Sequence, residues 1–399
     1  MPMKSAKQWI LTDRTQNIQK EKIELNARQL GAPKCRKLCV TKTTLRGGLS
    51  EGVEVVEINN GALSISVIPT RGMGIWRGSY RGIFLGWRSP VEGPVHPAFV
   101  HQNERGGLGW LYGFDECIVR CGLESNGAPG RDVVPNNMGE PTEMELTLHG
   151  RIANIPASRV TVEASGGAKP IVSVSGIVEE TMLFGPRFRL SARISTAPDA
   201  NWFRIEDEVS NLRAVESEME LLYHCNFGGP VLEEGARLVL PAVETAPRSA
   251  YRAEDVETWA VYRGPTPGFV EQCFWHVLRG DANGGTMALL RNAAGDLGVC
   301  IRFNLSELPC FTQWKNTAAE EDGYVTGLEP GTNYPNTRAF ERKQGRVPRL
   351  APGSSRRASL TVEVLDSARL VKAAEDEIEK LRGGTAHTLH RAPDPRFSA

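Results

Sequence analysis

Short runs in which apolar and polar residues alternate constrain the fold of this 399-residue chain more than any other feature. They recur from about residue 45 to residue 365, as in residues 63–67, 188–194 and 360–364. A period of two residues is typical of half-buried β-strands, whose side chains point alternately to two faces. Gly, Pro and Asn separate the runs and indicate turns between successive strands.

No amphipathic helix is evident between these predicted strands, so helical crossovers do not connect them. That excludes a doubly wound α/β fold and predicts an all-β protein, a large antiparallel β-sandwich. The length would allow two or three domains, but large β-sandwiches also run long as single units. We therefore expect residues 45–365 to form one sandwich domain.

The flanking segments have a different character from the sandwich. Residues 1–44 are mixed and polar, and we expect them to form an N-terminal extension that covers the sandwich. Residues 366–383 predict a helix that ends at Gly383-Gly384, with apolar residues at helical spacing: Leu370, Val371, Ala374, Ile378 and Leu381. This C-terminal helix should pack on the sandwich edge or mediate self-association, as in a homodimer. Residues 384–399 read as a mobile tail.

Charge and composition exclude several classes of partner. The 47 basic and 47 acidic side chains balance, whereas a nucleic-acid-binding face needs an excess of Lys and Arg. No stretch approaches the roughly 20 apolar residues of a membrane span, and Met1–Ser5 does not begin a signal peptide. The 8 cysteines contain no C-x-x-C pair, which favours free thiols in a reducing cytoplasm. We expect a cytoplasmic protein that binds neither nucleic acid nor membrane.

The run Tyr223–Gly228 carries the first candidate for chemistry. On a strand, Tyr223, Cys225 and Phe227 share one face, which is suited to packing. His224 and Asn226 share the other face. An imidazole can donate or accept a proton near neutral pH, so His224 is either a catalyst or a core histidine held by hydrogen bonds.

Two further segments combine a predicted strand with a reactive side chain. The run Leu146–Arg151 ends in His149, Gly150 and Arg151. The glycine would let a ligand approach the backbone, and the guanidinium could bind hydroxyls or a carboxylate. The run Tyr324–Pro330 places Glu329 at a strand end, either exposed at the rim of a sheet or held in a cavity as a base with a raised pKa.

These three segments together resemble the aldose 1-epimerase (galactose mutarotase-like) superfamily. That family places a Leu-His-Gly histidine, a His-x-Asn/Phe histidine and a Glu-Pro glutamate in one cleft of a large β-sandwich. The resemblance spans about residues 48 to 365. It is strongest to a subfamily of epimerase-like proteins whose substrate is not assigned. The matching residues here are Leu148-His149-Gly150, Tyr223–Phe227, Leu328-Glu329-Pro330, and the supporting runs Ile68–Met73, Gly122-Leu123 and Gly331–Asn336.

The resemblance implies a mutarotase, an isomerase that interconverts sugar anomers without metal or organic cofactor. His224 would be the general acid and Glu329 the general base, while His149 and Asn226 position a small sugar. One acid and one base suffice to open and close a sugar ring. The resemblance also implies an acidic residue that binds sugar hydroxyls, for which Glu271 is the nearest match.

Three further side chains are weaker candidates for substrate contact. Arg71 either contacts the sugar or pairs with a carboxylate at a sheet edge. Arg151 could bind hydroxyls, and Trp314 either stacks on a pyranose face or belongs to the core. The family's usual sugar-binding arginine and asparagine pattern is not clear here. The segment His96–Arg105 stands in its place, as a lid or as a surface loop, and we favour the loop.

Two other functions compete with the mutarotase. His149, His224 and Glu329 could form a two-histidine, one-carboxylate metal site in a metal-dependent sugar enzyme. A non-catalytic carbohydrate-binding sandwich would need aromatics and amides but no particular His and Glu pair. A nucleotide-dependent enzyme is not indicated, because Gly107–Gly113 has the wrong glycine spacing and no βαβ context.

Overall fold

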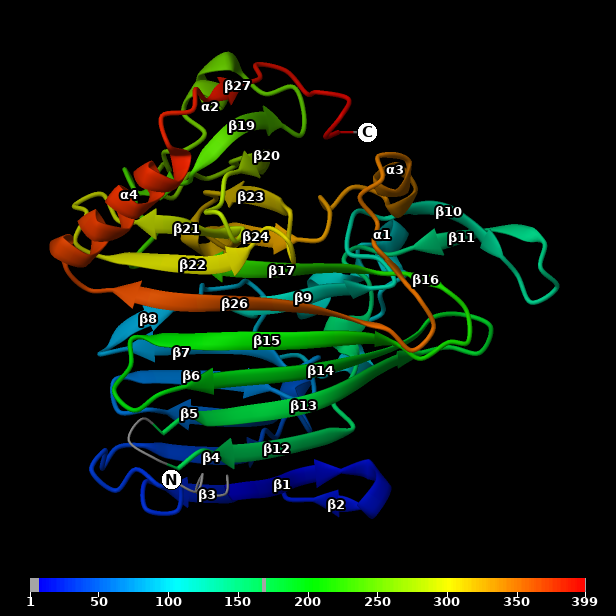
Figure 1. Ribbon diagram of the computed structural model, residues 1–399, viewed down its shortest axis with the longest axis vertical. Coiled ribbons are helices and arrows are strands. Elements are labelled where there is room, and N and C mark those ends of the chain that lie inside the picture. The colour runs from blue at the N-terminus through cyan, green and yellow to red at the C-terminus, as the bar shows by residue number, and fades with distance from the viewer. Residues whose placement is uncertain (1–6, 167–169, 399) are drawn as a thin grey trace.

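The alternating runs build two large β-sheets that pack face to face (Figure 1). The structure is a computed structural model, and it describes residues 7–166 and 170–398. Within that part of the chain, neighbouring strands are antiparallel, apart from one short parallel pair at the C-terminal edge. The predicted all-β sandwich is therefore confirmed.

The smaller sheet has ten strands among the described residues. Their spatial order is β18 (Arg237–Val239), β21 (Gly285–Arg291), β22 (Gly298–Asn304), β26 (Ser355–Leu365), β15 (Trp202–Asn211), β14 (Arg187–Thr196), β13 (Val172–Thr181), β12 (Arg159–Ala164), β1 (Lys7–Asp13) and β2 (Ile18–Gln19).

The larger sheet has thirteen strands within the same residues and carries the candidate site. Its order is β27 (Thr388–Leu389), β19 (Ala242–Pro247), β20 (Gln272–Leu278), β23 (Cys310–Asn316), β24 (Val325–Gly331), β17 (Glu220–Phe227), β9 (Ile118–Leu123), β7 (Gly74–Tyr80), β6 (Leu63–Ile68), β5 (Glu54–Asn59), β4 (Cys39–Thr44) and β3 (Ile23–Asn26), with β8 (Ile83–Leu85) paired to β7.

Smaller elements connect the strands. Two-stranded ribbons join β10 (Gly130–Pro135) to β11 (Pro141–Leu146) and β16 (Ser217–Glu218) to β25 (Arg349–Leu350). The helices are α1 (Glu104–Gly107), α2 (Ala253–Glu257), α3 (Arg338–Lys343) and α4 (Ala368–Arg382). The 3₁₀ turns are η1 (Arg14–Gln16), η2 (Gly48–Ser50), η3 (Pro97–Phe99), η4 (Gly109–Gly113), η5 (Ile152–Asn154) and η6 (Glu320–Asp322).

The main core lies between the two sheets, as the alternation predicts. Apolar side chains of both sheets form one buried cluster, with Leu360 and Val362 from β26 and Ile65 and Val67 from β6. Inward faces that interdigitate in this way are what hold a β-sandwich together. All eight cysteines lie within the described residues, and all are free thiols.

The predicted C-terminal helix is confirmed as α4, which ends at Gly383 in the left-handed conformation. Its buried residues Val371, Ala374 and Ile378 pack on Met287 and Leu289 of β21. Since Ala288 and Leu290 of the same strand point into the main core, the helix covers the outer face of the smaller sheet. Its apolar side is thereby used within the chain. No helix of the described residues is both long and apolar enough to cross a membrane.

Both terminal segments differ from their predicted roles. The described part of residues 1–44 does not lie over the sandwich but extends it, since β1 pairs with β12 and β4 pairs with β5. Residues 1–6, which include the whole Met1–Ser5 segment, lie outside the described residues.

The expectation of a mobile C-terminal tail is wrong for residues 384–398. The strand β27 pairs with β19, and the Phe397 side chain is buried. The Trp275 indole N–H donates to Ser398 Oγ at 2.8 Å. The pairing of β27 and the burial of the Phe397 ring anchor this segment, although its polar composition is typical of a mobile tail. Residue 399 lies outside the described residues.

Candidate active site

Strand β17 sorts its side chains as the sequence predicts. Tyr223, Cys225 and Phe227 belong to the core between the sheets. His224 and Asn226 project from the opposite face of the larger sheet and are buried there, with 4% and 0% of their surface exposed. A histidine on this face does not pack in the main core, so its surroundings decide what it can do.

The neighbouring strand β24 brings Glu329 beside His224. The two strands are antiparallel, and their register pairs Cys225 with Leu328, so the next residues on the opposite face lie together. His224 Nε2 lies 3.2 Å from Glu329 Oε1, and both side chains are nearly inaccessible to solvent. Two residues 105 positions apart in the sequence therefore form a buried acid–base pair.

Gly327 provides the space that this pair occupies. A Cβ atom on Gly327 would lie 2.7 Å from Glu329 Oε1 and 2.8 Å from His224 Cε1. Both contacts are closer than real Cβ atoms approach, and neither partner is at the end of a flexible exposed side chain. The absence of a side chain at this position is thus a requirement of the pair.

The hydrogen bonds around Asn226 fix the tautomer of His224. The Asn226 amide nitrogen donates to the carbonyl oxygens of Glu116 and His224, which orients the amide. Its Oδ1 lies 2.6 Å from His224 Nδ1. An amide oxygen can only accept, so Nδ1 carries the proton and donates. In the neutral ring, Nε2 is then left as an acceptor toward Glu329.

Burial shifts both partners toward their neutral forms. It raises the pKa of the Glu329 carboxyl well above its ordinary value, and the nearby Glu271 charge adds to the increase. Burial also lowers the pKa of the His224 imidazole well below its ordinary value, with His149 as the next cause. A contact between Nε2 and a carboxyl oxygen needs one proton between them. The pair therefore shares a single proton that either partner can hold.

His149 lies close to this pair and has the same tautomer. Its ring centroid is 5.4 Å from that of His224 and 4.6 Å from that of Trp110. His149 Nδ1 lies 2.8 Å from the Asn126 carbonyl oxygen, which accepts its proton. Burial lowers the pKa of His149 to about 4, so near neutral pH the ring is uncharged and offers Nε2 as an acceptor.

A buried glutamate supports His149 from behind. Glu220 Oε2 accepts the Asn126 backbone N–H at 2.8 Å, and the carbonyl of Asn126 in turn holds His149. Gly150, beside His149, adopts a positive φ of 67°, and a Cβ there would lie 2.1 Å from the Ser125 carbonyl oxygen. The glycine thus permits close backbone packing, which differs from the predicted approach of a ligand.

The two histidines and Glu329 line a pocket of about 460 Å³. That volume is in the range of small-molecule sites. Glu271 and Trp314 also line it, so the structure brings together five of the residues singled out in the sequence. The remaining lining residues come from several loops and strands: Leu108, Trp110, Leu111, Phe114, Ala128, Pro129, Leu148, Arg248, Cys273, Trp275, Thr312 and Pro335.

Sequence reasoning missed the aromatic wall of this pocket. Trp110 and Phe114 come from η4 and its end, with ring centroids 4.6 Å apart. Phe114 lies 5.1 Å from the His224 ring in an edge contact. The signal in the sequence is the aromatic run in Gly109–Phe114, which overlaps the glycine-spaced segment Gly107–Gly113.

Trp314 and Glu271 form a second polar arrangement at the pocket. The Trp314 indole N–H donates to Glu271 Oε2 at 2.7 Å, and its ring centroid lies 5.4 Å from that of His224. Arg248 Nη2 lies 3.3 Å from the other oxygen, Glu271 Oε1. Glu271 therefore holds the indole in a fixed orientation, and Arg248 compensates its charge.

Arg71 lies outside the pocket, so it is not placed to contact a ligand there. Its side chain is fully buried, and its Nε lies 2.5 Å from Glu116 Oε1. It also donates to the Gly113 carbonyl oxygen at 2.9 Å and to Asn154 Oδ1 at 2.8 Å. These bonds fix the loop that carries the aromatic wall, which is a structural role.

Arg151 also lies apart from the pocket. It lines a separate cavity of about 650 Å³ with Glu124 and Glu180. His101 of the His96–Arg105 segment lines this second cavity as well. The structure therefore places neither Arg151 nor this segment against the His224–Glu329 pair.

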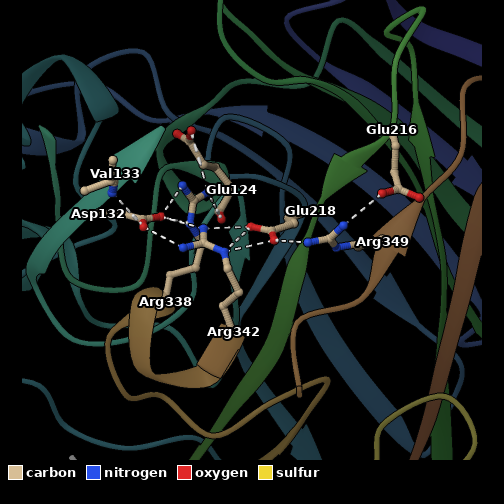
Figure 2. Close-up of polar contacts among 8 residues, drawn as sticks. All are labelled: Glu124, Asp132, Val133, Glu216, Glu218, Arg338, Arg342 and Arg349. Atoms are coloured by element: carbon tan, nitrogen blue, oxygen red, sulfur yellow. Dashed lines mark hydrogen bonds and ion pairs between the residues drawn. The ribbon is translucent and has the colours of Figure 1, made fainter. Parts of the chain in front are cut away.

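A network of ion pairs fixes the chain beyond Glu329 (Figure 2). Asp132 lies between two guanidinium groups, 2.5 Å from Arg338 Nη2 and 2.7 Å from Arg342 Nη1. Arg342 continues to Glu218 at 2.7 Å. The network ties α3 to β10 and β16, and so holds the preceding segment, including the lining residue Pro335, in place.

Metal ligation by the three predicted residues is not supported by their geometry. Among the described residues, the ligand atoms that converge within 4.8 Å of one another belong to Glu244, His390 and Asp394, and not to the pocket. Arg396 Nη2 bonds to both Glu244 and Asp394. That cluster therefore already contains a cation of the chain itself.

The two antiparallel sheets superpose on solved structures of the galactose mutarotase-like fold. A galactose mutarotase-like protein from Clostridium acetobutylicum superposes with a TM-score of 0.55 at 16% identity, covering 83% of this chain and 99% of that one. Galactose 1-epimerase from Lactobacillus acidophilus superposes with a TM-score of 0.51 at 11% identity, covering 83% and 99%. At these identities the likeness shows the fold alone.

The chain belongs to the family defined by a domain of unknown function (DUF4432), whose model matches residues 50–364. A crystal structure from Klebsiella pneumoniae subsp. pneumoniae, described as a "putative aldose 1-epimerase", is 37% identical. It covers 98% of this chain and 99% of its own, with a TM-score of 0.90. No curated protein matches the chain. The resemblance to the aldose 1-epimerase superfamily is thereby confirmed.

Proposed function

We propose that this protein interconverts the anomers of a sugar without a cofactor, as a mutarotase. The observation that supports this most is the contact of His224 Nε2 with Glu329 Oε1 at 3.2 Å, inside a pocket of about 460 Å³. A buried pair that shares one proton can act as acid and base in the same turnover. Structural kinship to a protein described as a "putative aldose 1-epimerase" supports the same reaction.

In the ring-opening step, the proton of the pair resides on His224 and Glu329 is a carboxylate. Glu329 takes the proton of the anomeric hydroxyl while His224 donates its proton to the ring oxygen. The bond between the anomeric carbon and the ring oxygen breaks, and a free aldehyde forms. Glu329 is now protonated and His224 neutral, which are the forms that burial favours.

In the ring-closing step, the aldehyde rotates and its other face meets the chain hydroxyl. That hydroxyl attacks the carbonyl carbon and gives its proton to His224, while Glu329 returns its proton to the carbonyl oxygen. Both groups regain their starting forms, so no oxidant, reductant or outside proton is consumed. Each group can contribute about 10²- to 10⁴-fold in rate.

The surrounding residues hold the sugar and the pair. His149 offers Nε2 to a sugar hydroxyl, and Asn226 keeps His224 in its tautomer. Trp314 offers an apolar face to the pyranose ring. Each Glu271 oxygen keeps a lone pair beside its bond to Trp314 or Arg248 and can accept a hydrogen bond from a sugar hydroxyl. Arg71 and Arg151 have no place in this mechanism.

The test is saturation-transfer NMR of anomer exchange over a panel of aldoses, uronates and sugar phosphates. At least one sugar should exchange faster with the protein than without it. If every sugar in the panel exchanged its anomers only at the spontaneous rate, the proposal would be wrong. Binding of sugars without faster exchange would instead support the carbohydrate-binding module that the sequence left open.

A further inference from the structure

Arg248 is the one cationic side chain that lines the pocket among the described residues. It directly follows β19, and its side chain is 44% exposed. Its backbone N–H donates to the Cys273 carbonyl oxygen at 2.9 Å, which fixes the base of the side chain. The guanidinium thus extends from the end of a sheet strand and lines the pocket.

Most of the hydrogen-bonding capacity of Arg248 is unused within the described residues. Its side chain makes one hydrogen bond, from Nη2 to Glu271 Oε1 at the long distance of 3.3 Å. A guanidinium carries five N–H donors in a planar fork. Among the described residues that line the pocket, no second carboxylate is free to accept the other donors, since Glu329 is held by His224.

Glu271 is already committed to another partner. Its Oε2 accepts the Trp314 indole N–H at 2.7 Å, a shorter bond than the one to Arg248. The fixed charges of the pocket are then one guanidinium with free donors and one carboxylate with both oxygens engaged. This asymmetry favours a ligand that brings its own negative charge to Arg248.

We propose that Arg248 selects sugars that carry an anionic group, a carboxylate or a phosphate, away from the anomeric carbon; this rests on the proposed mutarotase function. The planar fork binds such groups through two parallel charge-assisted hydrogen bonds. The anomeric end of the same sugar meets His224 and Glu329, and the anion lies beside Arg248 at the mouth of the pocket.

The test compares anomer exchange of glucuronate, glucose 6-phosphate and glucose by wild type, Arg248→Gln and Arg248→Lys. Arg248→Gln should lower kcat/KM for the preferred anionic sugar by about tenfold to a hundredfold, mainly through KM. Glucose should change by less than about threefold, and Arg248→Lys should recover part of the loss because the charge returns without the fork. The two anionic sugars distinguish a carboxylate from a phosphate.

A matched control is Arg357→Gln, which removes the same charge from a side chain that is 81% exposed on the other sheet. This variant should leave kcat/KM for anomer exchange of all three sugars unchanged. An equal loss for glucose and for the anionic sugars in Arg248→Gln would overturn the proposal, because Arg248 would then act only through Glu271.

The binding step is measured separately by isothermal titration of glucuronate and glucose 6-phosphate. If no sugar exchanges, the proposed mutarotase is wrong, and titration still decides the role of Arg248. Binding of either anion that weakens at least about tenfold in Arg248→Gln supports selection by charge. Equal binding by wild type and variant, or none by either, contradicts it.

Discussion

Glu220→Gln should remove a pH dependence of stability that the buried carboxyl imposes on the fold. Glu220 is fully buried on β17, and its Oε2 accepts the Asn126 N–H behind His149. Burial raises the pKa of this carboxyl to about 8, from an ordinary value of 4.5. Folding therefore keeps a proton that the unfolded chain releases.

The sign follows from proton binding. Where the folded state binds more protons than the unfolded state, stability falls as pH rises. The contribution of Glu220 to the stability of the folded state is fully present below pH 4.5 and is lost as pH rises toward about 8. At about 1.36 kcal/mol for each pH unit, the loss between about pH 5.5 and about pH 7.5 is about 2 to 3 kcal/mol.

Gln has the shape of the protonated carboxyl and does not titrate, so the variant loses this dependence. Urea unfolding should show that the difference in unfolding free energy between the two proteins shifts by about 2 to 3 kcal/mol in favour of the variant between those two pH values. Glu143→Gln, at a side chain that is 67% exposed, is the matched control. A difference between wild type and Glu220→Gln that stays constant with pH would refute the reasoning.

Two further predictions concern the pocket itself. Gly327→Ala should lower the rate of anomer exchange at least about tenfold, because the new Cβ enters the space of His224 and Glu329; an unchanged rate in the NMR assay would show that the pair is not needed in this geometry. Trp314→Phe should raise KM about threefold to tenfold, because the ring loses its hydrogen bond to Glu271; a lower kcat at unchanged KM would contradict a role in binding.

The fold was predictable because its signals are local. Alternation along each strand determines which side chains face the core, and it separated His224 from Tyr223 and Cys225 correctly. The order of His149, His224 and Glu329 along the chain resembles that of the aldose 1-epimerase superfamily, and this resemblance implied that they share one cleft. Neither inference needs knowledge of which loops cross the sheet.

The rest of the pocket depends on contacts between distant segments. Trp110 is placed by a loop whose path no periodicity encodes, and Arg248 reaches the pocket only because β19 pairs with β20 in the folded sheet. Arg71 looked available in sequence, but its burial against Glu116 is a property of the folded loop. The tail looked mobile because a strand pairing with β19 and the burial of Phe397 leave no mark in composition.

The most direct test of the account is the rate of anomer exchange in Glu329→Gln, measured with the sugar that wild type exchanges fastest. Gln fills the site of a buried carboxyl whose raised pKa favours its neutral form, so urea unfolding should show an intact fold. The account predicts that kcat falls by about 10²- to 10⁴-fold. A folded Glu329→Gln protein that exchanges the sugar at the wild-type rate would contradict the central claim that Glu329 is the base.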